Sequence, residues 1–238
     1  MISLTCFKNR FTPDWRMTLL TCVALAFFCH LGFWQLERAQ EKIEMLSAQA
    51  SQAKQASKRW QSEDPLPKQY QSIRVSGDYL DQHLLFDNQH YQHQLGYHVL
   101  TPFQMANGSL ILIDRGWVSA DQRRQVLPKI STPMNSTLDG TVYYPSEKNW
   151  VLGPNLEKKG AKLTIVERID TKLVGQFLHK SVYPFIIRLN KESGQEYVRE
   201  WPVVAMSPDR HYGYAFQWFA IASVILILFV ALNLKKKI

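Results

Sequence analysis

Cysteine is scarce in this sequence of 238 residues, and its three cysteines, Cys6, Cys22 and Cys29, all lie near the N-terminus. The long middle part of the chain has none, so it must fold without disulfide bonds. Cys22 and Cys29 are seven residues apart within an apolar stretch. Small, apolar side chains that fill space in a helix bundle explain this pair better than a metal site does.

The usual catalytic signatures are also missing. The chain contains no G-x-S-x-G, H-E-x-x-H or C-x-x-C sequence and no phosphate-binding or dinucleotide-binding glycine motif. The formal net charge is +8, yet no RNP, zinc-finger or helix-turn-helix pattern accompanies it. We therefore predict a protein that is neither an enzyme nor a nucleic-acid-binding protein.

Two segments near the ends of the chain lack charge altogether. Residues 17–34 and 214–234 are apolar and long enough to cross a hydrocarbon core of about 30 Å as helices. No A-x-A-like cleavage site follows the first segment, which favours an uncleaved span over a signal peptide. We predict transmembrane helices over residues 17–36 and 211–234, and therefore a lipid bilayer as one partner.

The positive charge is concentrated beside these two spans. Lys8, Arg10 and Arg16 precede the first span, and Lys235–Lys237 follow the second. By the positive-inside rule, the tails 1–16 and 235–238 face the cytoplasm and residues 37–210 form an exported domain. The short N-terminus leaves little room for a transit peptide, which favours a bacterial inner membrane and a periplasmic domain over a mitochondrial membrane.

The exported part predicts an α+β fold dominated by antiparallel strands. Residues 37–60 are rich in Ala, Gln, Glu and Lys and predict a helix that continues outward from the first span. Beyond Pro67 the period changes to two, and Asn107-Gly108 between two apolar runs indicates a hairpin. We expect short helices over 121–127 and 170–179. The expected strands are 70–79, 84–86, 97–103, 109–118, 138–144, 163–166 and 185–189.

Histidine is the remaining residue type with chemical potential. His83, His90, His93 and His98 form a cluster, and the spacing of His90 and His93 allows weak metal chelation through their imidazole nitrogens. A histidine-rich polar loop between strands is the favoured interpretation, because no carboxylate or thiolate follows at ligand spacing.

Two other histidines lie at the expected membrane boundary. His30 is near the outer end of the first span, and His211 begins the second, with Tyr214 and Trp218 on the same helix face. Ionisable groups at this depth are functional candidates, and a neutral imidazole beside aromatic rings could ligate a haem iron. Arg38 or Arg210 could then pair with the propionates. The alternative, that both histidines simply tolerate the headgroup region, is favoured for His30 and stays open for His211.

Four segments of the chain form a distinctive set: Leu31-Gly32-Phe33-Trp34-Gln35-Leu36-Glu37-Arg38, Gly96-Tyr97 to Thr101-Pro102-Phe103, Ile113-Asp114-Arg115-Gly116-Trp117-Val118 and His211-Tyr212-Gly213-Tyr214-Ala215-Phe216-Gln217-Trp218-Phe219. Together they resemble one known family, Surfeit locus protein one, the assembly factors of haem–copper cytochrome c oxidase. They occur in the family's order and with its two-span layout. In the Arg-Gly-Trp segment, Gly116 allows the strand to bend or approach another backbone, and Trp117 supplies packing.

The resemblance implies a chaperone-like role in the biogenesis of respiratory complex IV, around haem a insertion into oxidase subunit I or stabilisation of that subunit. It also implies contacts with other oxidase assembly factors, and haem a binding at His211. The chain departs from the family in its long, Gln-rich outward helix and in the histidines between 83 and 98, so no copper role is carried over. A membrane-anchored tethering protein without a cofactor is the alternative.

Overall fold

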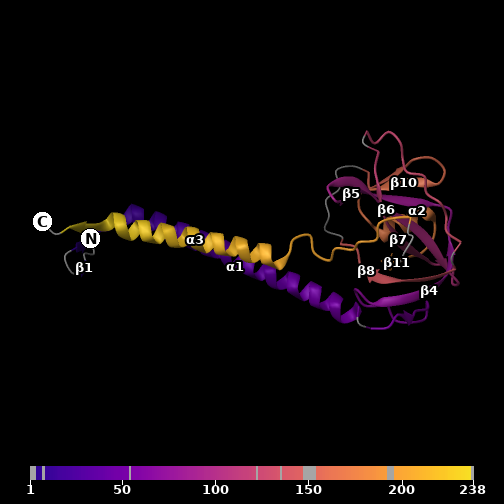
Figure 1. Ribbon diagram of the computed structural model, residues 1–238, viewed down its shortest axis with the longest axis horizontal. Helices are drawn as coiled ribbons and strands as arrows, with labels where there is room; N and C mark the ends of the chain where they lie inside the picture. The colour runs from indigo at the N-terminus through magenta and orange to yellow at the C-terminus, as the bar shows by residue number, and fades with distance from the viewer. Residues whose placement is uncertain are drawn as a thin grey trace. The chain divides into compact units, whose positions relative to one another are not determined.

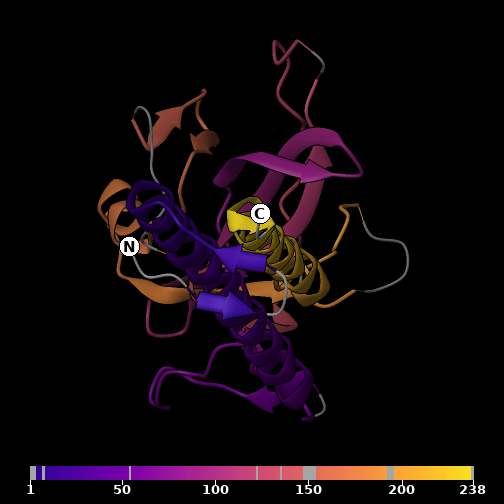
Figure 2. The same cartoon turned by 90° about the vertical axis from the view of Figure 1, so that its left-hand side faces the viewer.

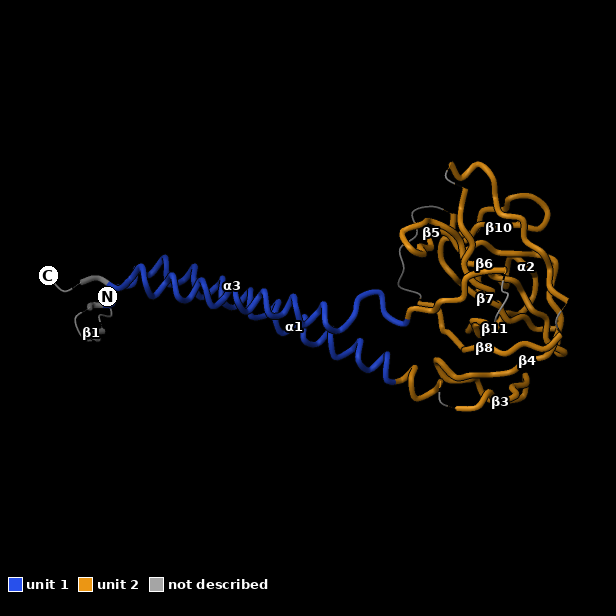
Figure 3. Tube along the Cα trace, in the orientation of Figure 1, with its two compact units in different colours: residues 1–47, 203–238 blue, residues 48–202 orange. Residues whose placement is uncertain are grey.

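The computed structural model describes residues 4–6, 9–53, 55–121, 123–134, 136–146, 154–191 and 196–236. The chain divides into two compact units (Figure 3). The first, which we call the helical unit, comprises residues 1–47 and 203–238, and the second, the β domain, comprises residues 48–202.

The helical unit is built on two long helices, α1 (Trp15–Ala53) and α3 (Pro208–Asn233), which run side by side within it (Figure 1). Both are long and apolar enough to cross a membrane. Large apolar side chains such as Leu20, Phe216 and Leu232 are exposed on them. In water these surfaces would be unfavourable, and in a bilayer they meet acyl chains. The two apolar helices at the ends of the chain are therefore confirmed.

Short strands lie before the N-terminal end of α1 and after the C-terminal end of α3. Strands β1 (Leu4–Cys6), β2 (Asn9–Phe11) and β12 (Leu234–Lys236) form an antiparallel sheet in the order β1-β2-β12 (Figure 2). The basic residues Lys8 and Lys237 of the predicted cytoplasmic tails lie outside the described residues.

The outward helix is shorter than the sequence predicts. It ends at Ala53, whereas the composition predicts helix up to Trp60. Strand β3 (Lys58–Arg59) pairs with β4 (Ser72–Tyr79) in parallel, and the Trp60 ring packs edge-on against Tyr183 and Phe185. Burial of this large ring, which is 5% exposed, outweighs the helix propensity of the preceding residues.

Five strands of the β domain close into a barrel. They follow one another round the ring as β4, β8 (Thr137–Tyr143), β11 (Val182–Leu189), β7 (Leu110–Ser119) and β6 (Gln94–Met105), and β6 pairs back to β4. All these pairings are antiparallel except the parallel pair β7–β11. The predicted, mostly antiparallel β domain is confirmed.

Further strands extend this ring from β6. Strand β5 (His83–Tyr91) pairs with β6, β10 (Leu163–Val166) pairs with β5, and β9 (Leu156–Lys158) pairs with β10. The predicted hairpin joins β6 to β7, where Gly108 has a φ of +81° and the Asn107 side chain accepts a hydrogen bond from Ser109 N. This positive φ is the reason the turn needs glycine.

The barrel interior is filled by alternate residues of its strands. All five strands contribute to one hydrophobic cluster, which includes Ile73, Phe103, Ile113, Val142 and Phe185. Their intervening residues point outward, as the two-residue period of a strand requires. A second cluster outside the barrel joins β5, β7, β10 and β11 to the short helix α2 (Thr171–Leu178).

One of the two expected short helices is present. Helix α2 begins after Asp170, whose carboxylate accepts a hydrogen bond from Leu173 N, and it confirms the prediction over 170–179. The helix predicted over 121–127 was wrong for its described residues, 121 and 123–127, which form a turn and bends. The Asp121 carboxylate accepts bonds from Arg123 N and Gln125 N, and Arg124 has a φ of +52°, outside the helical region.

Candidate functional site

A close contact between α1 and α3 lies at the centre of the helical unit. A Cβ atom added to Gly32 would lie 2.6 Å from the Phe219 ring, so the absence of a side chain at position 32 lets that ring pack against the α1 backbone. Phe33 meets the same ring edge-on, with centroids 5.3 Å apart. Close helix approach at small residues is the usual way in which membrane helices associate.

The same pair of helices holds the imidazole of His211. Its Nδ1 lies 2.8 Å from Gln35 Oε1, and His211 is 8% exposed. Phe28, seven residues before Gln35, stacks on Trp218, seven residues after His211, with ring centroids 5.8 Å apart. Seven residues are close to two helical turns, so one face of α1 meets one face of the antiparallel α3 at both levels.

The hydrogen bond with Gln35 determines the chemistry of His211. An amide oxygen only accepts, so Nδ1 carries the proton and Nε2 of the neutral ring keeps its lone pair. Nε2 is buried and has no hydrogen-bond partner among the described residues. In metal-binding histidines, too, the second ring nitrogen donates to an oxygen that fixes the tautomer.

A second cluster of motif residues stabilises the β domain. Trp117, 7% exposed, donates from its indole nitrogen to Gln89 O, and its ring occupies the space beside Gly96, where a Cβ would lie 2.6 Å from the ring. Gly116 has a φ of +127°, and a Cβ there would lie 2.7 Å from Val198 O. Gly96 thus lets the Trp117 ring pack directly on β6, and Gly116 lets the 197–199 segment approach β7, the close backbone approach that the sequence predicts for Gly116.

Arg115, the residue before Gly116 on β7, is a buried cation. Its guanidinium donates to Ser131 O at 2.7 Å, lies 3.3 Å from Glu196 Oε2, and lies over the Tyr197 ring at 4.9 Å. Its side chain is 5% exposed. Such a paired, hydrogen-bonded charge ties separate loops to β7, and we assign Arg115 a structural role.

The comparison with known proteins matches this arrangement of motifs. The model of the SURF1 family covers residues 22–223, which include the β domain and most of α1 and α3. The chain belongs to the SURF1 family. This is the Surfeit locus protein one family that the four sequence segments indicate, and membership implies, in general terms, a role in cytochrome oxidase assembly.

Relatives of this chain extend along almost its whole length. A SURF1-like protein of Rickettsia conorii is 26% identical over 90% of both chains. A SURF1-like protein of Rickettsia felis is 27% identical over 90% of this chain and 96% of its own length. A third, from Rickettsia bellii, is 27% identical over 89% of this chain and 87% of its own.

The other predicted haem contacts are only partly assembled around His211. Trp218 stacks on Phe28, whereas Tyr214 is 38% exposed on α3. Arg38 is paired with Glu41 at 2.7 Å and lies over the Trp34 ring, and Arg210 is exposed at the start of α3. His30 is also exposed. Among these side chains, the buried His211 and the half-buried Trp218 are the pair that the helix packing fixes.

The histidines between 83 and 98 do not form one cluster. His90 and His93 are exposed at the end of β5 and in the following turn, and His83 and His98 are held by hydrogen bonds to Thr101 and Asp114. Over the described residues, no three His, Cys, Asp or Glu side chains come together as a metal site. The weak proposal of a metal at His90 and His93 gains no third ligand there.

Sequence reasoning missed Gln35 as the partner of His211. Gln35 is part of the first motif segment, and the signal for its role is a shared spacing: Phe28 and Gln35 are seven residues apart, as are His211 and Trp218. Two antiparallel helices that match at one of these levels also match at the other.

Proposed function

We propose that this protein is an assembly factor for haem–copper cytochrome c oxidase that holds haem a at His211 during the biogenesis of subunit I. The observation that carries the proposal is the orphaned, buried Nε2 of His211 opposite a Gln35-bound Nδ1. Family membership supports the oxidase context, and the chemistry of this imidazole supports a haem iron as the group it meets.

The residues fit a haem in donor chemistry and in surroundings. Haem would supply an iron centre, and His211 would hold it through its imidazole nitrogen Nε2. Gln35 holds the proton on Nδ1, and Phe28 and Trp218 supply apolar aromatic surface on the same helix faces. Since Nε2 is buried, neighbouring side chains must shift to admit the ligand, and release to a client can use the same movement.

With the membrane topology that we propose, this site lies near the outer boundary of the bilayer. In the proposed topology both tails are cytoplasmic, the bilayer is a bacterial inner membrane, and the β domain is periplasmic. There the β domain contacts oxidase subunit I and other assembly factors, and the protein does no chemistry of its own. The exposed apolar faces of α1 and α3 support placement in lipid.

The visible spectrum of the purified, full-length protein tests the haem proposal directly. The protein is produced together with haem A synthesis and purified in detergent, as wild type, His211→Ala and His30→Ala. We expect a haem a band in the wild type and in His30→Ala, because His30 is exposed. We expect His211→Ala to lack this band. Gln35→Leu keeps the ligand but removes its acceptor, and we expect haem affinity to fall about 10–100-fold.

The alternative of a cofactor-free tethering protein predicts a different result. A colourless wild type under these conditions, or a band that survives in His211→Ala, would refute the ligand assignment. The family role would then rest on protein contacts alone.

A further inference from the structure

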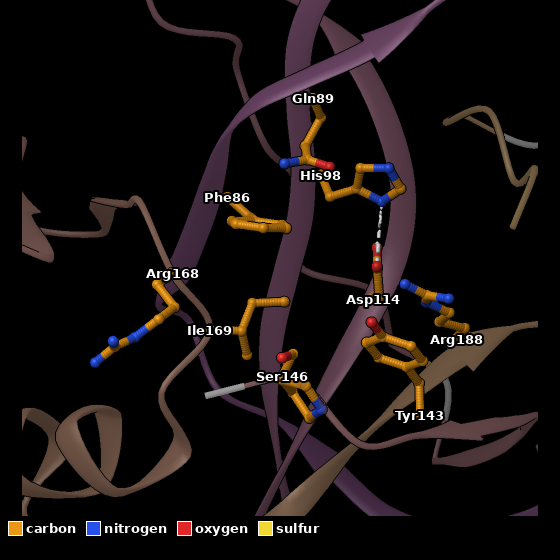
Figure 4. A pocket seen from close by; sticks show the side chains of 10 residues that line it. Phe86, Gln89, His98, Asp114, Tyr143, Ser146, Arg168, Ile169 and Arg188 are labelled. Atoms are coloured by element: carbon orange, nitrogen blue, oxygen red, sulfur yellow. Dashed lines mark hydrogen bonds and ion pairs between the residues drawn. The ribbon is translucent and has the colours of Figure 1, made fainter. Parts of the chain in front are cut away.

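A pocket on the β domain carries a cation that the proposed function does not use. The pocket lies over one face of strands β5, β6, β7, β8 and β11, and its lining includes Phe86, His98, Asp114, Tyr143, Arg168 and Arg188 (Figure 4). Each of these five strands provides at least one of these side chains, and four of them, β6, β7, β8 and β11, belong to the barrel, so the sheet fixes the geometry of the pocket. The segment that precedes α2 provides Arg168.

The Arg188 guanidinium is held in place by two aromatic rings. Its central carbon lies 3.6 Å from the centroid of the Tyr143 ring and 5.4 Å from that of Trp201. Trp201 is itself fixed, because its indole nitrogen donates to Leu189 O at 2.9 Å. Aromatic contacts of this kind stabilise the cation and hold its plane without using its N–H groups.

Those N–H groups have no protein acceptor within the described part of the chain. The Arg188 side chain takes part in no hydrogen bond or ion pair with a described residue, and its Nε atom is buried without a partner. A guanidinium with five donors is rarely left this way, because unpaired buried donors are unfavourable. An external acceptor would remove that cost.

The nearest candidate for an internal acceptor is already engaged. Asp114 is opposite Arg188 in the register of β7 and β11, and its side chain is 3% exposed. Both of its carboxylate oxygens accept from His98 Nδ1, at 3.0 and 3.1 Å, and one also accepts from Gly116 N. Figure 4 shows the His98–Asp114 contact beside the Arg188 side chain. The carboxylate therefore lies beside the guanidinium without forming an ion pair with it.

We propose that this pocket binds the oxyanion of a small molecule, a carboxylate or a phosphate, through Arg188. The planar fork of arginine matches both groups in a bidentate geometry. Arg168, 3.2 Å from Asp170, adds positive charge at the rim, and Phe86 offers apolar surface to the organic part of the ligand. The site is independent of His211, and it gives the β domain a ligand-binding function of its own.

Calorimetric titration of the full-length protein in detergent tests this site. The probes are sodium propionate and inorganic phosphate, used in parallel to distinguish a carboxylate from a phosphate source. We expect saturable binding of one or both at millimolar concentrations or below, weakened about tenfold or more in Arg188→Gln. Arg74→Gln is the matched control, because Arg74 is an exposed arginine on β4 that already pairs with Asp139.

A spectroscopic readout covers the case in which Arg188→Gln misfolds. In protein labelled with ¹⁵N-arginine, the Nε–H resonance of Arg188, assigned by its loss in Arg188→Lys, should shift when the bound anion is added. Failure of wild-type protein to bind either anion would overturn the proposal. The proposal would also be overturned if the Arg188 resonance shifted in Asp114→Asn but not on addition of propionate or phosphate. Arg188 would then be the internal counter-ion of Asp114. The haem spectrum tests His211 separately, so failure of anion binding at Arg188 would leave the haem proposal standing.

Discussion

At the scale of single residues, His83 shows how burial sets the charge of a side chain. Its ring is 2% exposed, and Nδ1 and Nε2 lie 3.1 and 3.3 Å from the hydroxyls of Thr101 and Thr132. Burial, assisted by the positive charge of Arg115, lowers the pKa of His83 to about 4. The imidazole is therefore neutral in the folded domain at physiological pH.

This depressed pKa predicts an acid-sensitive β domain. The unfolded chain binds a proton near pH 6.5, whereas the folded one resists protonation down to about pH 4. The contribution to stability is therefore complete above pH 6.5 and is lost as pH falls toward 4. Between pH 7.5 and pH 5 we expect the free energy of unfolding to fall by about 2 kcal/mol through His83. Denaturant titrations followed by tryptophan fluorescence measure this difference.

Two variants make the assignment specific to His83. His83→Gln keeps hydrogen-bonding groups but removes the titrating imidazole. The difference in its unfolding free energy between pH 7.5 and pH 5 should therefore be smaller than that of the wild type by about 2 kcal/mol. His90→Gln, at an exposed position of the same strand, should behave as wild type. An unchanged pH slope in His83→Gln would show that other groups govern the acid response.

At the scale of elements, two glycines with positive φ allow the effect of backbone strain on stability to be distinguished from that of a steric clash. Gly116 has a φ of +127° and lies against Val198 O and Tyr197, whereas Gly160 has a φ of +95° and no atom within 4 Å of an added Cβ. Gly160→Ala should therefore lower the free energy of unfolding only through conformational strain, by about 1–2 kcal/mol. Gly116→Ala adds a steric clash with backbone and should cost about 2–5 kcal/mol of unfolding free energy in total.

Thermal and denaturant unfolding of the two variants measure this difference. The clash in Gly116→Ala should also separate the 197–199 segment from β7, because Trp117 and Val198 pair there through two backbone hydrogen bonds. Amide hydrogen exchange at Trp117 and Val198 should then be faster in Gly116→Ala only. Equal destabilisation by the two substitutions would contradict the packing role assigned to Gly116.

Local patterns predicted most elements, whereas long-range packing decided the rest. The alternation in residues 72–79 and 163–166 and the Asn107-Gly108 turn were sufficient for β4, β10 and the β6–β7 hairpin. The end of α1 was mispredicted because Trp60 is buried among residues distant in sequence, such as Phe185. The pairings that close the barrel, β7 with β11 and β4 with β6, have no local signal.

The candidate site was predictable to a similar extent. Helix length and interfacial position pointed to His211, yet its chemistry depends on Gln35, which is 176 residues away in sequence. Arg188 and Asp114 likewise become neighbours only through the parallel register of β7 and β11. Residue type indicates which side chains can act, and the pairing of distant elements determines which of them do.

At the scale of the whole molecule, the distribution of charge predicts how the chain crosses the membrane. Three basic residues precede the first span and three follow the second, and both tails should stay in the cytoplasm. The intervening β domain should then lie on the opposite side. Its Met134 is fully exposed, so a cysteine there would be accessible to reagents from that side.

Cysteine labelling in intact bacterial spheroplasts tests this topology. In a Cys22→Ser, Cys29→Ser background, the native Cys6 marks the N-terminal tail, and Cys6→Ser combined with Met134→Cys marks the β domain. A membrane-impermeant maleimide should modify the Met134→Cys protein before lysis and Cys6 only after it. The reverse pattern would place the β domain in the cytoplasm. Labelling of both sites before lysis would instead show that the two helices do not cross the bilayer as a pair, because each crossing transfers the chain to the other side.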